Sequence, residues 1–249
     1  MNNCILVCFL FVFFILNVTK AKAQKKSSKY EVGIAVGAFI YQGDLTPYRF
    51  GSLKTMRPGF IVHGSRKINA TMAVRLNLSI ASLKGDDSKY NTPAYRQQRN
   101  FKFSTPLIEL SPQLVWSPWG WEELGPKISP YAFAGVGLSY LRIRTDLSNF
   151  NASHFILEEN LPVRIAADLA HGTPRLLPVI PIGGGIRYAI SPKFVMNAEL
   201  SYRTTFTDYL DGFSKAANPN LKDKYYNVSV GVIYRFGKNS SWDCPPVNK

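Results

Sequence analysis

The chain has 249 residues, a formal net charge of +14 and three cysteines. Cys4 and Cys8 lie in an apolar N-terminal run, so a chain processed after that run keeps only Cys244. This excludes an intramolecular disulfide and a cysteine metal site in the processed chain. Past the run, no segment stays apolar for the ~20 residues that a membrane-spanning helix needs.

The first 23 residues have the pattern of a cleaved signal peptide. An apolar run from Cys4 to Val18 precedes Ala21-Lys22-Ala23, whose small first and third residues suit signal peptidase. We therefore expect residues 1–23 to be removed before Gln24, with an uncleaved N-terminal anchor as the alternative. Because an exported protein rarely meets nucleic acid, the positive charge favours outer-membrane lipid and lipopolysaccharide phosphates as partners.

Eight segments alternate apolar with small or polar side chains, the period-2 pattern of membrane barrel strands. In chain order these segments are 30–38, 59–66, 72–80, 108–116, 130–142, 176–190, 194–203 and 227–236. The sequence therefore predicts an all-β fold over residues 24–236. We expect an eight-stranded antiparallel up-and-down transmembrane β-barrel of OmpA-like size. A soluble periplasmic β-sandwich is the alternative.

The connections between these segments alternate between long and short. The long ones have about 15, 20, 30 and 19 residues, which is typical of the external loops of outer-membrane barrels. The short ones, 67–70, 118–129 and 191–193, then become periplasmic turns. Both termini are expected in the periplasm, and 237–249 forms a C-terminal tail. Tyr234-Arg235-Phe236 lies at a strand end, where interfacial aromatic residues belong.

Charged residues at the inward positions of these strands form a distinct set. Its members are Glu31, Arg75, Glu109, Arg187, Glu199, Arg203 and Arg235. The interior of an eight-stranded barrel is roughly filled by side chains, so we expect a plug of ion pairs. Closure of the ring makes the first and last strands neighbours, and Glu31 is therefore predicted to pair with Arg235. A gated or proton-conducting channel is the alternative.

The sequence offers no convincing catalytic, cofactor or metal site. His63-Gly64-Ser65 resembles the His-x-Ser pair of outer-membrane lipid A deacylases, but it lies at the periplasmic end of its strand and lacks an evident carboxylate partner. Asp86-Asp87 and the pair Asp208 and Asp211 lack an EF-hand-like spacing, so we expect solvated loop acids there rather than a Ca²⁺ site. The chain is predicted not to be an enzyme.

Four stretches carry a resemblance to a known family. They are 37–45, 129–137, 181–188 and 200–211, and their most specific residues are Gly43, Asp44, Arg203, Thr205, Phe206, Asp208, Tyr209 and Asp211. Together they resemble the PorG family of Bacteroidota outer-membrane barrels. The resemblance implies a non-enzymatic accessory of type IX secretion that contacts periplasmic ring proteins of the PorK and PorN type.

If the resemblance holds, the partner surface is expected on the periplasmic side. The candidate residues there are Trp119, Trp121, Glu122, Glu123 and Cys244. An intermolecular disulfide through Cys244 stays open. For Asp208 to Asp211 at an external loop mouth, both local capping and recognition of an external ligand stay open. The alternative functions are a general OmpA-like structural or lipopolysaccharide-binding barrel and a small passive pore.

Overall fold

The computed structural model describes residues 28–121, 128–158, 160–217 and 223–238. The expected signal peptide, residues 239–249 of the expected tail, Glu122, Glu123 and Cys244 lie outside the described residues.

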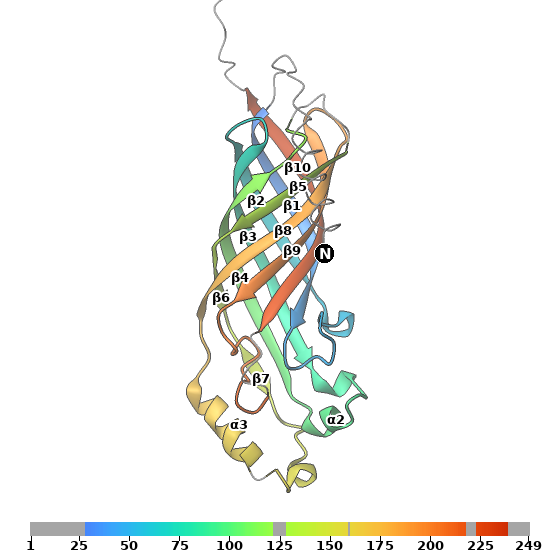
Figure 1. Cartoon of the computed structure of the whole chain (residues 1–249), viewed down its shortest axis with the longest axis vertical. Coiled ribbons are helices and arrows are strands. Elements are labelled where there is room, and N and C mark those ends of the chain that lie inside the picture. Colours follow the sequence, from blue (N-terminus) through green and yellow to red (C-terminus); the bar gives the residue numbers. More distant parts are fainter. Residues whose placement is uncertain (1–27, 122–127, 159, 218–222, 239–249) are drawn as a thin grey trace, which may run out of the picture.

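Antiparallel β-segments close into a single ring (Figure 1). The segments are β1 (Ser28–Gln42), β2 (Arg57–Lys67), β3 (Met72–Asp86), β4 (Lys102–Trp116), β5 (Ile128–Gly135), β6 (Gly137–Leu141), β7 (Arg144–Asp146), β8 (Leu176–Ala189), β9 (Phe194–Thr205) and β10 (Lys224–Lys238). β1 pairs with β10, with Glu31 opposite Arg235, and this pairing closes the ring. Because β5, β6 and β7 share one place in the ring, the predicted eight-stranded barrel is confirmed.

The fifth strand of the ring is interrupted twice and extends beyond the predicted 130–142. Its three parts keep one register against β4. The breaks fall opposite Pro112 and Pro106, whose carbonyls accept from the N–H groups of Val136 at 3.2 Å and Arg142 at 3.1 Å. Since proline has no N–H to donate in return, the ladder loses a hydrogen bond at each break.

β3 and β4 are also longer than the sequence pattern predicted, because they pair as far as Asp86 and Lys102. The alternation fades past Ile80 since outward positions there, such as Ser82 and Lys84, are polar. The extended ends of β3 and β4 project beyond the apolar wall and carry the loops. We call this end of the barrel the loop rim, and the opposite end, where β1 begins and β10 ends, the terminal rim.

The connections at the loop rim contain short helices. They are the 3-10 turns η1 (Leu53–Thr55), η2 (Asp87–Lys89) and η3 (Ala152–Phe155), and the helices α2 (Tyr95–Arg99) and α3 (Asn160–His171). Buried apolar residues from the loops and strand ends, including Leu45, Phe101 and Phe213, form a common core beneath them. Within the described parts of the chain, no helix is long and apolar enough to cross a membrane.

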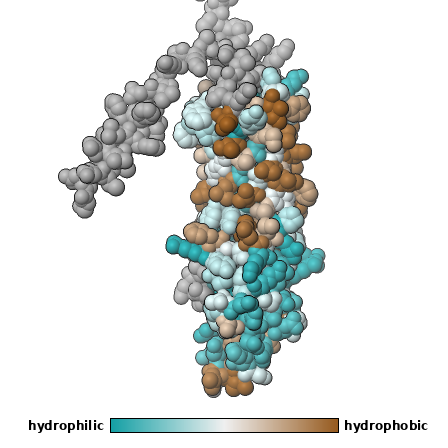
Figure 2. Space-filling model, turned by 90° about the vertical axis from the view of Figure 1, so that its right-hand side faces the viewer, coloured by the Kyte–Doolittle hydropathy of each residue, from teal (hydrophilic) through white to brown (hydrophobic). Residues whose placement is uncertain are grey.

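The outer wall of the barrel is an exposed apolar band. Outward side chains such as Ile34, Leu76 and Val230 are about half exposed or more. Figure 2 shows this band over the half of the molecule nearer the terminal rim, with a mostly hydrophilic loop half below it. Water-exposed apolar surface on this scale is typical of a wall that faces lipid.

Candidate functional site

The lumen at the terminal rim is closed by a cluster of charged side chains around Glu31. Glu31 Oε2 lies 3.0 Å from Arg187 Nη1, and Oε1 lies 3.3 Å from Arg235 Nε and 3.6 Å from Lys67 Nζ. All four residues are buried. The sequence pattern places Lys67 in a periplasmic turn, and this prediction is wrong, because Lys67 continues the inward row of Ser65 on β2.

Trp121 covers this cluster. The guanidinium of Arg187 lies 4.2 Å from the centre of the Trp121 ring, and Lys67 Nζ donates to the Trp121 carbonyl at 3.3 Å. The side chain is folded back over the lumen because Trp121 N donates to Ala70 O at 3.2 Å. At 3% exposure, Trp121 cannot present a partner surface as predicted, whereas Trp119 is 56% exposed.

A second ion pair fills the middle of the lumen. Arg75 Nη1 donates to Glu199 Oε2 at 2.7 Å, and Arg75 Nε donates to Gln113 Oε1 at 2.7 Å. The Tyr131 hydroxyl donates to Glu199 Oε2 at 2.8 Å. The Arg75 guanidinium also lies 4.2 Å from the centre of the Phe133 ring. The cation is thereby held by both polar and aromatic groups.

The third ion pair lies nearest the loop rim. Glu109 Oε2 accepts from Arg203 Nε at 3.1 Å and from the Tyr225 hydroxyl at 2.8 Å. Arg203 also donates to the amide oxygen of Asn227. The structure thus brings the seven expected inward charges into three groups. Lys67 is an additional member of the group around Glu31.

At the loop mouth, Tyr41 bridges two buried carboxyl groups. Its hydroxyl oxygen lies 2.7 Å from Asp211 Oδ2 and 2.6 Å from Asp223 Oδ1. A phenol has one proton to donate, so the arrangement requires a second proton on one of the carboxyls. Burial raises the pKa of Asp211 and that of Asp223 well above the ordinary range, with Asp44 and Asp208 adding negative potential to both.

The surroundings of this pair account for several motif residues. Asp211 accepts from Phe213 N at 2.8 Å, and Asp223 accepts from Leu210 N at 3.1 Å. A side chain at Gly43 would collide with Tyr41 and Asp223, so only glycine fits there. The expectation that Asp211 is a solvated loop acid was wrong, because its side chain is completely buried and accepts from a backbone N–H group.

Asp168 of α3 joins the third loop to the fourth. Its carboxylate accepts from the backbone N–H groups of residues 214, 215 and 216 at 3.2, 3.0 and 2.8 Å. It also accepts from the Tyr209 hydroxyl at 3.3 Å, and the Tyr209 ring stacks on His171 with centroids 4.1 Å apart. Sequence reasoning missed Asp168, whose sequence signal is its helical spacing from the apolar Leu161 and Ile165 of α3.

The second loop is closed around Asp87, which is fully buried. Its carboxylate binds Arg96 Nη1 at 2.7 Å and Arg99 Nε at 2.6 Å. Arg96 also donates to the backbone oxygen of Asp44 at 3.0 Å, which ties this loop to the first. Asp86 is buried as well, 3.1 Å from Lys84 Nζ. The expectation of solvated acids at Asp86-Asp87 was therefore wrong.

The remaining motif residues have different surroundings. Thr205 is buried, and its hydroxyl donates to the backbone oxygen of Thr207 at 3.3 Å. Phe206 is more than half exposed. Asp208 is only partly buried, and desolvation raises its pKa. The motif thus combines inward contacts of the loop mouth with one outward aromatic ring.

The catalytic motif considered from the sequence lies inside the lumen. His63 and Ser65 are both buried, and within the described residues neither His63 Nε2 nor Ser65 Oγ has a hydrogen-bond partner. The same described parts contain no group of three His, Cys, Asp or Glu residues placed to hold a metal ion.

The closed ring, apolar wall and filled lumen define an eight-stranded barrel of the outer-membrane type. The chain belongs to the family described as "Domain of unknown function (DUF6089)", which matches residues 7–244. A comparison with curated proteins finds no match. The resemblance to the PorG family stays a prediction.

Solved structures with a similar fold have low sequence identity. Ail of Yersinia pestis, in complex with the heparin analogue sucrose octasulfate, is 14% identical, with a TM-score of 0.45 over 84% of this chain and 99% of its own. Neisserial surface protein A is 15% identical, with a TM-score of 0.46 over 86% of this chain and 100% of its own. OprG of Pseudomonas aeruginosa is 11% identical, with a TM-score of 0.45 over 85% of this chain and 97% of its own.

Proposed function

We propose that this protein is a non-enzymatic, plugged β-barrel of the outer membrane that acts as a structural, lipopolysaccharide-binding scaffold. The observation that carries this proposal is the filled lumen, in which three ion-pair groups at successive depths leave charged side chains bound to one another. Together with the apolar wall, this supports a membrane anchor for the loops rather than a pore.

The proposal includes an orientation. The terminal rim carries the short connections, and the loop rim carries the folded loops (Figure 1). In outer-membrane barrels the short turns face the periplasm and the long loops face outward. Both termini would then be periplasmic, and the loop mouth around Tyr41 would face the outside.

The first and second loops together supply a surface suited to lipopolysaccharide. Lys54 Nζ donates to Lys89 O at 3.3 Å, and Lys89 Nζ donates to Lys54 O at 3.0 Å, so each exposed lysine reaches the backbone of the other. Beside them, Phe50 and Leu53 are 74% and 70% exposed. Paired cations next to apolar side chains match the phosphates and acyl chains of a lipopolysaccharide headgroup region.

Binding of purified lipopolysaccharide to the refolded protein tests this function. The double variant Lys54→Gln/Lys89→Gln is expected to bind at least about tenfold more weakly, whereas Lys193→Gln at the terminal rim serves as the matched control. Equal binding by all three proteins would contradict the assigned surface. Planar-bilayer conductance well above leak would contradict the plugged lumen.

A second candidate function is that of a type IX secretion accessory, which rests on the PorG resemblance. The structural feature that favours it is Trp119, which is 56% exposed at the terminal rim and is available to a periplasmic partner. Crosslinking through a periplasmic tag, with Trp119→Ala as the test variant and Trp116→Ala as its control, is expected to recover ring proteins only when Trp119 is present. Failure of the unmodified protein to recover any would reject this candidate.

A further inference from the structure

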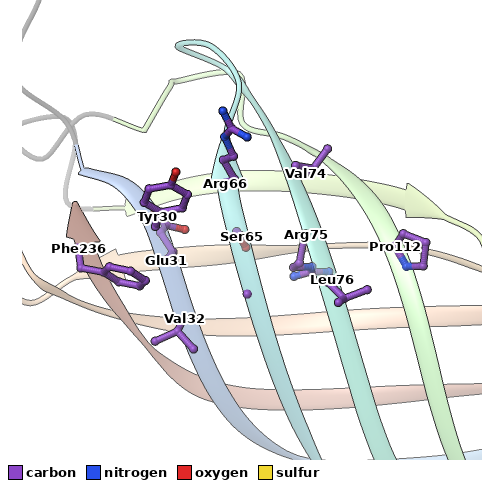
Figure 3. Close-up of a pocket in the computed structure, with 11 residues that line it drawn as sticks. Tyr30, Glu31, Val32, Ser65, Arg66, Val74, Arg75, Leu76, Pro112 and Phe236 are labelled. Atoms are coloured by element: carbon purple, nitrogen blue, oxygen red, sulfur yellow. The ribbon is translucent and has the colours of Figure 1, made fainter. Parts of the chain in front are cut away.

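The apolar wall is hollowed at one place near the terminal rim. The hollow has a volume of about 450 Å³, within the usual ~300–1,000 Å³ of small-molecule sites. Figure 3 shows it on the outer faces of the first strands, with Tyr30 and Phe236 at one side and Val74, Leu76 and Pro112 at the other. Glu31, Ser65 and Arg75, which alternate with the outward residues and are buried in the lumen, also line the hollow. The outward residues bound its open side, which faces lipid.

Gly64 creates the hollow. It occupies an outward position of β2, directly between Val32 of β1 and Leu76 of β3 in the sheet register. The outward residues nearer the loop rim on β2, Phe60 and Val62, have large apolar side chains, whereas a Cβ built on Gly64 would meet no atom within 4 Å. The wall thus lacks one side chain at position 64, and the neighbouring side chains do not fill the space.

A charged group stands at the end of the hollow. Arg66 is the next outward residue of β2 toward the terminal rim, and its side chain extends toward the turn at that rim (Figure 3). It is exposed, and no ion pair of the described residues involves it. A guanidinium binds phosphate through two parallel N–H donors, more specifically than an ammonium does.

We infer that this hollow is a binding site for one phospholipid molecule. An acyl chain would lie over Gly64 between Val32 and Leu76, and the phosphate would bind Arg66. An apolar trough ending at a guanidinium fits an amphiphile with an anionic head, and the surrounding wall already faces hydrocarbon. The site rests on the orientation proposed above, which places Arg66 in the periplasmic leaflet.

Two substitutions separate the two halves of the site. Gly64→Leu fills the trough without a clash, since the space above Gly64 is open. Arg66→Gln removes only the charge. The matched controls are Ala132→Leu, an outward small residue of β5, and Arg57→Gln, at the opposite end of β2.

Native mass spectrometry of the full chain, released from detergent micelles with added phosphatidylglycerol or diacylglycerol, provides the measurement. Gly64→Leu is expected to lower retention of both lipids at least about fivefold, and Arg66→Gln to lower retention of phosphatidylglycerol alone by a similar factor. The controls should retain lipid as the unmodified protein does. Equal retention by all variants would overturn the inference.

A variant that does not fold into a barrel must be distinguished from one that has lost only the lipid site. Heat-modifiable mobility in gels, measured on the same samples, reports whether each variant is folded. If all variants are folded and lipid retention does not change, the phospholipid site is rejected and the plugged scaffold stands. If the unmodified protein does not fold into lipid, the proposed function fails first.

Discussion

Neutralising one member of the Glu109–Arg203 pair is expected to destabilise the barrel at least as much as neutralising both. The Glu109 carboxylate is fully buried and accepts from Arg203 at 3.1 Å, Tyr225 at 2.8 Å and Ser111 at 3.2 Å. In Arg203→Met the two hydroxyl donors remain, but the buried charge has lost its counterion, at a cost of ~3–5 kcal/mol. Glu109→Gln strands the guanidinium at a similar cost.

The double variant Glu109→Gln/Arg203→Met leaves no unpaired charge in this group. We expect it to cost no more than either single variant, so the coupling energy should reach ~3 kcal/mol. Urea unfolding in lipid vesicles, followed by tryptophan fluorescence, measures all three, with the exposed loop residue Glu158→Gln as the control. Additive losses would refute the reasoning, because they would mean that the lumen solvates each charge independently.

Three further predictions concern the loop mouth. Asp168→Ala leaves three backbone N–H groups without their acceptor, so loop 208–217 should lose ~3 kcal/mol of hydrogen-exchange protection while the strands keep theirs. Burial raises the pKa of Asp211 and that of Asp223, so the folded mouth binds more protons than the opened one. The stability that these two groups contribute should be fully present below about pH 4, the ordinary carboxyl pKa, and should fall as the pH rises above it. Proteolysis of the loops against pH measures this fall, and Asp223→Asn should flatten it. Gly43→Ala should open the mouth and accelerate the same proteolysis at every pH, and an unchanged rate would contradict the steric argument.

Much of the barrel could be predicted from the sequence because the inward or outward direction of each strand residue depends only on its position along the strand. A strand between lipid and a packed lumen must alternate its side chains, so the inward charges follow from residue spacing alone. The register of β1 against β10, with Glu31 opposite Arg235, needs only the alternation and the closure of the ring. The breaks of the fifth strand had a signal too, since Pro106 and Pro112 lie in the adjacent strand.

The loop mouth could not be predicted in the same way, because its contacts join residues far apart in the chain. Tyr41 and Asp211 are 170 positions apart, and Asp168 binds a loop more than forty residues further on. Asp211 and Asp223 look like solvated loop residues in the sequence, and only the assembled loops bury them. Lys67 and Trp121 were misplaced for a related reason, since the fold of the turn over the lumen depends on contacts with the next turn.

The positions of the motif residues bear on where a partner would bind. Gly43, Tyr209 and Asp211 contact other loop residues, so the packing of the mouth by itself accounts for their chemistry. Residues that are occupied in this way make poor contacts for another molecule, because binding would first have to break the existing interactions. Exposed side chains are better candidates. Those are Trp119 at the terminal rim, and Lys54 and Lys89 in the first and second loops. Because these residues lie at opposite ends of the barrel, a binding assay for a partner at one end can use the other end as its internal control.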